Sequence, residues 1–321
     1  MDISLVIPLF NEEESLPELV AWIQRVAEPQ GWALEAILVD DGSNDGSWAV
    51  VRQLAEQYTF VRGIRFRRNY GKAAALHTGF QAARGRVVVT MDADLQDSPD
   101  ELPELYRMIT EEGYDLVSGW KKRRHDPMGK TLPSKLFNWT MRKATGIKLH
   151  DFNCGLKAYR NEVVKSIEVY GEMHRHIPFL AKAAGFQHIG EKVVEHRARQ
   201  YGYSKYGMKR LITGFLDFLS ITFVLRYGRK PMHFFGMWGV LVFLIGFILT
   251  VWVLGVKQYL IWQERFEDIR EVTDQPLFYL ALVALIIGVQ LFTAGYLGEL
   301  TSRNFPDRNL YEVSEEVGQA T

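Results

Sequence analysis

Short apolar runs alternate with segments of mixed polarity between residues 3 and 118 of the chain. Five of the runs are typical of buried strands, at residues 3–9, 36–39, 60–66, 86–91 and 115–118. Between them, apolar residues recur at helical spacing, which predicts helices over residues 12–26, 46–57, 71–83 and 99–112. Continuous apolar strands separated by helices predict an α/β fold, a mostly parallel sheet with helices on both faces. Ligands of such sheets bind beyond the carboxyl ends of the strands.

The first predicted helix carries a start signal. Asn11 is followed three residues later by Glu14, which is the spacing of a capping box. We therefore expect the helix to begin at Glu12, directly after the first strand.

Two long apolar segments lie near the C-terminal end. Neither Phe234–Val256 nor Leu277–Gly298 contains a charged residue. At about 1.5 Å of helical rise per residue, each can cross the roughly 30 Å hydrocarbon core of a bilayer. Buried core helices are the alternative, but uncharged runs of this length are rare in soluble helices. The N-terminus has no basic region before its first apolar run, so it is not expected to be a signal peptide.

Charge is balanced over the chain but unevenly distributed. There are 38 Lys and Arg residues against 38 Asp and Glu residues, which argues against a dedicated nucleic-acid-binding protein. Basic residues flank the apolar segments, namely Lys209, Arg210, Arg226, Arg229 and Lys230 before the first and Arg303 and Arg308 after the second. The intervening loop is acidic, with Glu264, Glu267, Asp268, Glu271 and Asp274. The positive-inside rule therefore predicts both termini in the cytoplasm and the acidic loop outside.

Two further features refine this picture. Cys154 is the single cysteine, so no intrachain disulfide and no cysteine-based zinc site can form. The stretch 211–225 is apolar with basic residues at both ends, which fits an amphipathic helix in the headgroup region or a buried helix of the soluble domain.

Acidic residues follow the fourth predicted strand. Because side chains two positions apart on a strand share a face, Asp92 and Asp94 are expected to converge on one point. A divalent cation would relieve the repulsion between them; oxygen ligands suit Mg²⁺ or Mn²⁺, and Gln96 is a candidate to help hold the geometry. An EF-hand is excluded, since Asp97 stands where the loop glycine is needed. For this motif alone, a solvated turn is the alternative.

A second acidic cluster, Asp40-Asp41-Gly42-Ser43, follows the second predicted strand. Helix capping would explain it in isolation. With both clusters in one sheet, a nucleotide site is the better interpretation, because a carboxylate can accept hydrogen bonds from a base or ribose. The glycine-rich dinucleotide and P-loop motifs do not occur, so those classes of site are not predicted.

An ordered set of motifs points to one family. The motifs are Val6-Ile7-Pro8-Leu9-Phe10-Asn11-Glu12, Val39-Asp40-Asp41-Gly42-Ser43, Asn69-Tyr70-Gly71-Lys72 and Met91-Asp92-Ala93-Asp94-Leu95-Gln96. Together they resemble the family 2 glycosyltransferases, which have the Rossmann-like GT-A fold. Within that family the sequence is most similar to the polyprenyl-phosphate glycosyltransferases, such as dolichol-phosphate mannose synthase and bacterial undecaprenyl-phosphate glucosyltransferases. The likeness continues through residues 151–157, 172–175 and 201–206 and includes the two C-terminal spans.

The resemblance implies roles for the matching residues. Pro8, Phe10 and Glu12 would line the nucleotide pocket, and Asp41, Lys72 and Asp92 would also contact the nucleotide. Asp92 and Asp94 would be the catalytic residues and, with Gln96, would hold Mg²⁺ or Mn²⁺ on the diphosphate. The Q-x-x-R-W signature of processive polysaccharide synthases is not evident, because Tyr201 follows Gln200, and this disfavours chain extension.

A basic segment from Lys121 to Lys143 follows the fifth predicted strand, where the related synthases place their lipid-phosphate contacts. A basic cradle there would suit an acceptor phosphate and the anionic leaflet. The candidate acceptor-phosphate residues are Lys121, Arg123, Arg124, Lys130 and Lys135. A merely solvated face is the alternative. Farther along there are two polar clusters that either pack structurally or close over the sugar or acceptor: His174, Arg175 and His176, and then Glu195, His196, Arg197 and Arg199.

The resemblance implies a complete organisation. Residues 1–205 would be a cytoplasmic catalytic domain and 206–231 interfacial helices. The spans would cover 232–256 and 277–299, with an extracytoplasmic loop over 257–276 and a cytoplasmic tail over 300–321. The protein would lie in a bacterial plasma membrane, and related enzymes suggest a homotetramer.

The predicted reaction is inverting transfer of a hexosyl group, with UDP-glucose as the expected donor, to undecaprenyl phosphate. A phosphomonoester with a second pKa near 6 is already largely dianionic and needs no strong general base. Two alternatives stay open: a glycolipid synthase that uses a lipid hydroxyl, and a non-catalytic membrane scaffold that keeps the transferase fold.

Overall fold

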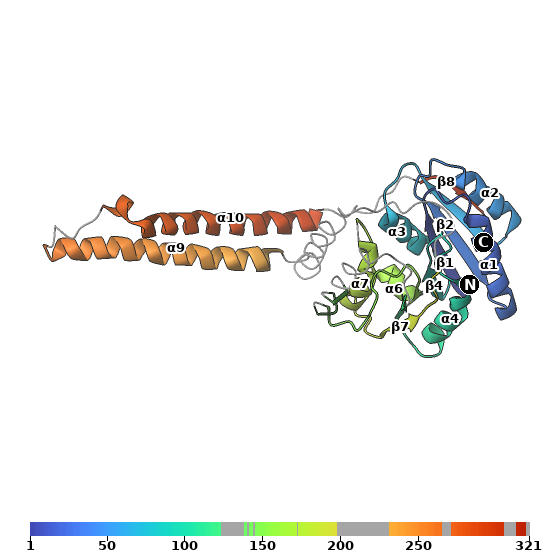
Figure 1. Ribbon diagram of the computed structural model, residues 1–321. Coiled ribbons are helices and arrows are strands. Elements are labelled where there is room, and N and C mark those ends of the chain that lie inside the picture. The colour runs from blue at the N-terminus through green and yellow to red at the C-terminus, as the bar shows by residue number, and fades with distance from the viewer. Residues whose placement is uncertain are drawn as a thin grey trace. The chain divides into compact units, whose positions relative to one another are not determined.

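The computed structural model describes residues 1–122, 138–139, 141–143, 145–171, 173–197, 231–264, 271–304 and 313–318. The chain divides into two compact units (Figure 1). The first comprises Met1–Phe218 together with Arg308–Thr321, and the second comprises Leu219–Asp307.

An eight-stranded sheet forms the centre of the first unit, in the order β7-β5-β6-β4-β1-β2-β3-β8 over the described residues. The strands are β1 (Ile3–Leu9), β2 (Leu34–Asp40), β3 (Val61–Phe66), β4 (Val87–Thr90), β5 (Leu116–Trp120), β6 (Lys157–Arg160), β7 (Ile189–Val193) and β8 (Val313–Val317). β4, β1, β2 and β3 are mutually parallel, and β5 is parallel to β7. Only β6 and β8 run antiparallel to their neighbours. The predicted α/β fold with a mostly parallel sheet is confirmed.

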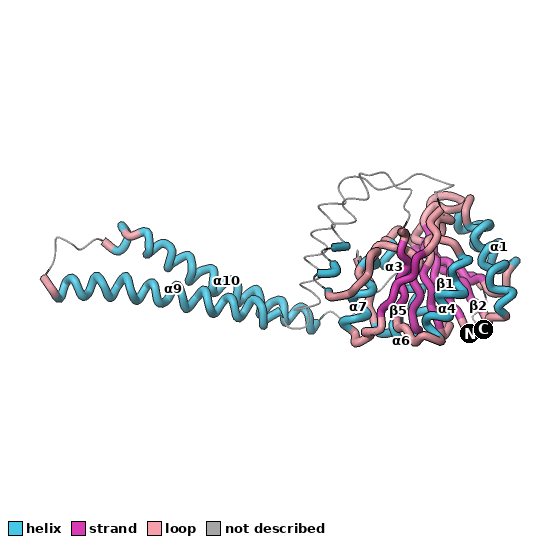
Figure 2. The backbone as a smooth tube through the Cα atoms, turned by 60° about the horizontal axis from the view of Figure 1, so that its bottom comes forward, coloured by secondary structure: helices cyan, strands magenta, loops and turns pink. Residues whose placement is uncertain are grey.

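Helices lie on both faces of this sheet (Figure 2). They are α1 (Leu16–Ala27), α2 (Ser47–Gln57), α3 (Lys72–Ala82), α4 (Leu102–Thr110), α6 (Asn161–Ser166) and α7 (Ile177–Ala183), with 3-10 turns η1 (Glu28–Gln30), η2 (Pro99–Glu101) and η3 (Met173–Arg175). The side chains of β1 alternate between the faces, so Ile3 and Leu5 pack towards α1 while Val6 meets Gly79 of α3.

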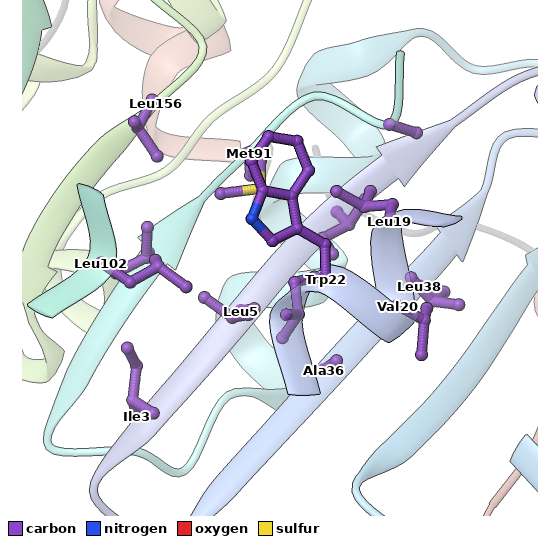
Figure 3. Close-up of a cluster of buried hydrophobic side chains, with 14 of the residues drawn as sticks. Ile3, Leu5, Leu19, Val20, Trp22, Ala36, Leu38, Met91, Leu102 and Leu156 are labelled. Carbon is purple, nitrogen blue, oxygen red and sulfur yellow. The ribbon is translucent and has the colours of Figure 1, made fainter. Parts of the chain in front are cut away.

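The main core lies between the sheet and α1, α2 and α4 (Figure 3). Leu5 of β1, Leu19 and Trp22 of α1 and Leu102 of α4 are all 5% exposed or less. Trp22 also donates its indole N–H to Asp100, at 2.9 Å, so its polar atom is satisfied at the edge of the core. This core anchors the strand ends from which the site loops depart.

The predicted start of the first helix is wrong. α1 begins at Leu16, and the chain before it turns through Asn11, which has a left-handed φ of 55°. The Asn11 side chain accepts a hydrogen bond from the Asn44 backbone N–H, at 2.9 Å, instead of capping a helix. The capping-box pattern failed because Asn11 bonds to the loop after β2, a contact that local spacing does not reveal.

In the second unit, two long apolar helices pack side by side (Figure 1). α9 (Pro231–Trp262) and α10 (Pro276–Asn304) have mean hydropathies of 2.7 and 2.3 over their candidate spans, and the short turn η5 (Val272–Asp274) precedes α10. α9 continues past Val256, where the predicted span ended, to Trp262. Glycines bring the backbones together: a Cβ on Gly246 would lie 2.8 Å from the backbone nitrogen of Leu285. Of residues 206–231, predicted as interfacial helices, only Pro231 is described, as the first residue of α9.

The segment predicted as a tail contributes the last strand of the first unit. β8 pairs antiparallel with β3, with Gly63 opposite Val317. Trp48 of α2 donates its indole N–H to Glu315, at 2.9 Å, and Arg62 forms an ion pair with Glu316, at 3.2 Å. The chain therefore returns from the apolar helices to the sheet it left.

Candidate active site

A cavity of about 140 Å³ lies at the carboxyl ends of β1 and β4. It is lined by Pro8, Lys72, Leu76, Thr90, Met91, Asp92, Asn153, Cys154, Gly155, Lys157, Tyr159, His174, Arg175 and Ile177. Among the predicted site residues, Pro8, Lys72 and Asp92 line this cavity.

Asp92 lies just beyond β4 and faces the start of α3. Its carboxylate accepts a hydrogen bond from the ammonium of Lys72, the first residue of that helix, and forms an ion pair with it. Burial favours the neutral form of Asp92, but the charges of Lys72, Lys121 and Lys157 outweigh it and hold the pKa well below its usual range. Asp92 is therefore an ionised acid among cations at physiological pH.

Two further lysines reach this region from the other side. Lys157, at the start of β6, is only 3% exposed and donates to the backbone carbonyl of Cys154. Burial lowers its pKa. Lys121, directly after β5, forms an ion pair at 2.8 Å with Asp97, which is completely buried. Burial disfavours the charge on Lys121, but Asp97 and weaker neighbours outweigh it and raise the pKa above its usual value.

Asp94 and Gln96 lie on the turn that follows Asp92, outside the cavity lining. The strand ends at Thr90, one residue before its predicted end, and Leu95 takes a left-handed φ of 58°. Asp94 accepts a hydrogen bond from the backbone N–H of Gln96, at 3.3 Å. Strand alternation was therefore the wrong reason to place Asp92 and Asp94 together, because a turn carries both.

The second acidic cluster holds loops together. Asp41 is 5% exposed, and its carboxylate accepts hydrogen bonds from the backbone N–H groups of Tyr70, at 2.7 Å, and Gly71, at 2.9 Å. Burial raises the pKa of Asp41, and this effect outweighs the two hydrogen bonds, which lower it. Gly42 (φ 72°) packs on the Arg68 backbone, where a Cβ would come within 2.6 Å. Asp41 thus fixes the loop that leads into Lys72, and its predicted contact with a nucleotide stays a prediction.

Phe10 and Glu12 lie on the loop after β1, and neither lines the cavity. The backbone N–H of Glu12 donates to Ser47 at the start of α2, at 2.8 Å. This contact ties the β1 loop to the β2 loop at the edge where a nucleotide was predicted.

The candidate acceptor residues are only partly described. Lys121 forms the ion pair with Asp97 described above. Arg123, Arg124, Lys130 and Lys135 lie outside the described residues.

The sequence marked residues 151–157 as part of the family likeness and His174 and Arg175 as a polar cluster, but it assigned no site role to Asn153, Gly155 or Lys157. Asn153, Gly155 and Lys157 come from the segment that enters β6, and His174 and Arg175 come from η3. Burial and the charges of Lys72 and Arg175 hold the pKa of His174 well below its usual value. The motif at 151–157 was visible in the sequence, but only the antiparallel pairing of β6 with β4 brings it opposite Asp92.

The donor set fits a hard divalent cation only in part. Among the residues that the structure describes, no three His, Cys, Asp or Glu side chains converge as a preformed site. Asp92 and Asp94 on one turn offer carboxylate oxygens, and Mg²⁺ and Mn²⁺ take further oxygens from water and phosphates. The residues on this turn therefore offer carboxylate oxygens to a divalent cation, and a bound diphosphate would have to supply further ligands.

Comparison with known proteins gives a consistent result. The family model described as "Glycosyl transferase family 2" matches residues 4–168. Dodecaprenyl-phosphate galacturonate synthase of Rhizobium johnstonii is 36% identical over 331 residues, which cover 100% of this chain and 95% of the relative. Undecaprenyl-phosphate 4-deoxy-4-formamido-L-arabinose transferase of Shewanella sediminis is 36% identical over 325 residues, covering 99% and 94%.

Among solved structures, glucosyl-3-phosphoglycerate synthase of Mycobacterium tuberculosis in complex with Mn²⁺, UDP-glucose and phosphoglyceric acid superposes with a TM-score of 0.53. The match covers 70% of this chain and 79% of that one at 21% identity. At this identity the likeness is one of fold, and it confirms the expected GT-A architecture.

Proposed function

The chain belongs to glycosyltransferase family 2, and from this premise we propose that its cavity transfers one sugar from a nucleotide sugar to the phosphate of a membrane polyprenol. Similarity along the whole chain to relatives named for polyprenyl-phosphate products carries the proposal. The chain is a glycosyltransferase, and the groups around Asp92 are those such a reaction needs.

The donor's diphosphate is proposed to lie against Asp92 and Lys72. We propose that Asp92 and Asp94, with Gln96, hold Mg²⁺ or Mn²⁺, which when bound supplies Lewis-acid stabilisation to the departing diphosphate. Lys72 at the N-terminus of α3 adds a cation where negative charge develops, and the helix dipole has the same sign. Pro8, Phe10, Glu12 and Asp41 are proposed to hold the nucleotide at the adjacent loop edge.

The proposed chemistry is a single displacement at the anomeric carbon. An oxygen of the lipid phosphate forms the new bond to this carbon as the bond to the diphosphate breaks, and the nucleoside diphosphate leaves with the electron pair. The dianionic phosphate needs no strong general base, so the protein contributes positioning and charge. One displacement inverts the anomeric centre. Arg123, Arg124, Lys130 and Lys135 are the proposed contacts of the acceptor phosphate, with Lys121 adding charge from its pair with Asp97.

The transferred sugar is proposed to be a hexuronate. UDP-glucose was the donor expected from resemblance, whereas the two relatives are named for galacturonate and 4-deoxy-4-formamido-L-arabinose. Three cationic side chains, Lys72, Lys157 and Arg175, line the cavity against the single carboxylate of Asp92. Lys157 and Arg175 are not assigned to the diphosphate above, and cationic side chains there would favour a sugar that carries its own carboxylate.

The proposed location is the bacterial plasma membrane, with the catalytic unit in the cytoplasm. α9 and α10 are long and apolar enough to cross a bilayer, and the acceptor exists only there. A lipid hydroxyl acceptor is less consistent with this site, because it would require a general base.

A donor and acceptor screen tests the proposal. Purified full-length protein in lipid nanodiscs is given undecaprenyl phosphate, Mn²⁺ or Mg²⁺, and UDP-galacturonate, UDP-glucose or UDP-4-deoxy-4-formamido-L-arabinose. We expect a lipid-linked uronate and one nucleoside diphosphate per transfer. Transfer to diacylglycerol but not to undecaprenyl phosphate would overturn the acceptor, and faster transfer of glucose would overturn the hexuronate.

A further inference from the structure

We propose that Gly155 is a positioning residue that acts through Asp92: the side chain it lacks leaves the space in which the Asp92 carboxylate lies. The functional part of this inference rests on the role proposed above for Asp92. Its structural part can be tested without any transfer reaction.

The last pair of the β4–β6 ladder lies next to both residues. β6 runs antiparallel to β4, and Thr90 and Lys157 are the last paired residues at this end. Asp92 and Gly155 each lie two residues beyond this pair, outside the paired strands, and the Asp92 carboxylate lies against Gly155.

The clearance between them is too small for a Cβ. An atom added there would lie 2.6 Å from Oδ2, 2.7 Å from Cγ and 3.0 Å from Oδ1 of Asp92. All three are carboxylate atoms, so the carboxylate lies across the Cα of Gly155. Aspartate has only two side-chain torsions, and relief of the overlap therefore requires a different χ1 rotamer or a backbone shift. Either change moves the carboxylate from its place beside Lys72.

The segment around Gly155 is held from several directions, so it cannot easily retreat. Thr90 donates its hydroxyl to the Gly155 carbonyl, at 2.8 Å, and Lys157 donates to the Cys154 carbonyl. Behind the segment, a Cβ on Gly119 of β5 would come within 2.7 Å of the Cys154 sulfur. Relief of the overlap therefore requires the Asp92 side chain to move.

Backbone strain is not the reason why glycine is required at position 155. Gly155 is not among the glycines with positive φ, unlike Gly42 and Gly71. Alanine is therefore compatible with the Gly155 backbone, and Gly155→Ala isolates the contact with Asp92.

The test combines a thermal-stability cycle with kinetics on the full-length protein. The cycle compares Gly155→Ala in the wild-type and Asp92→Ala backgrounds, because Asp92→Ala removes the atoms that would overlap. Gly190→Ala is the matched control: its Cβ would lie 2.5 Å from the Tyr114 ring, and neither Gly190 nor Tyr114 lines the cavity.

We expect Gly155→Ala to lower the Tm in the wild-type background and to leave it unchanged in the Asp92→Ala background. In the transfer assay it should lower kcat about 100-fold, while the KM for undecaprenyl phosphate stays within twofold. Gly190→Ala should lower the Tm and leave kcat unchanged. If Gly155→Ala alone does not fold, its folding in the Asp92→Ala background supports the proposal.

An equal loss of Tm in both backgrounds, or failure to fold in both, would overturn the inference, since the overlap would then involve other atoms. A wild-type kcat for Gly155→Ala would also overturn it. Absence of lipid transfer by the wild-type protein would instead reject the proposed function and leave the stability cycle intact.

Discussion

The ion pair between Lys121 and Asp97 offers a direct test of how charge is organised beneath the cavity. Asp97 is completely buried, and the Lys121 side chain is 14% exposed, at an N–O distance of 2.8 Å. Lys121→Met keeps the length of the side chain and removes the ammonium. The Asp97 carboxylate would then lie in the protein interior without this cation.

The expected loss of folding stability follows from the burial of the Asp97 carboxylate. Removal of one partner from a buried ion pair costs about 3–5 kcal/mol, because the other charge is left uncompensated. Water has some access to Lys121, so we expect the lower end, about 3 kcal/mol. For a unit of roughly 200 residues this corresponds to a Tm lowered by about 6–12 °C. Lys121→Met with Asp97→Asn should recover part of the loss, because the lone charge is gone.

The assay is thermal unfolding of the full-length protein, followed by circular dichroism in detergent. Lys122→Met is the matched control, because the neighbouring Lys122 is exposed and lies 5.6 Å from the Trp120 ring centroid. Its Tm should fall by no more than about 2 °C. If Lys121→Met and Lys122→Met had the same Tm, the Asp97 pair would contribute nothing, and Lys121 would be available for the acceptor contact predicted from sequence.

Four shorter predictions concern other parts of the chain. Asp92→Asn should abolish metal-dependent sugar transfer, and a rate within tenfold of wild type would contradict the proposed role. Cys154 is 2% exposed and burial raises its thiol pKa to about 12, so iodoacetamide at pH 8 should label it only after unfolding. Burial and the charge of Arg175 lower the pKa of His176 to about 4. As the pH falls, His176 is therefore protonated in the unfolded chain at a higher pH than in the folded protein. Stability should therefore fall as the pH drops from about 6.5 to 4, and His176→Gln should flatten that dependence in a urea titration. Gly246→Leu should disrupt the contact of α9 with α10, whereas Gly255→Leu should not, since no atom lies within 4 Å of a Cβ there; protease accessibility in detergent would show the difference.

The strands at the centre of the sheet could be predicted because they are buried on both faces. β1 spans Ile3–Leu9 as predicted, and β2 and β3 lie within a few residues of their predicted positions. Such strands are continuous apolar runs, and the signal is contained in each run itself. The two apolar helices were predicted for the same reason.

The strands that were missed depend on partners distant in sequence. β6 (Lys157–Arg160) is four residues long with a cation at each end, and β7 and β8 carry charges within short segments. These strands form because an edge of the sheet is already present to pair with them. Five of the residues that line the cavity lie on β6 or on the segment that enters it, so the sequence predicted Pro8, Lys72 and Asp92 as site residues but not Gly155 or Lys157.

The pairing of β8 with β3 limits the possible membrane topologies, and this argument does not depend on the distribution of Lys and Arg residues. Strands of one sheet cannot pair across a bilayer, so β3 and β8 must lie on the same side of it. The chain between them contains α9 and α10, and only an even number of crossings lets β8 return to β3. The two crossings predicted from the flanking Lys and Arg residues would satisfy this condition. A single crossing would leave Trp48 without its Glu315 partner and expose the β3 edge, which hydrogen exchange in nanodiscs would detect.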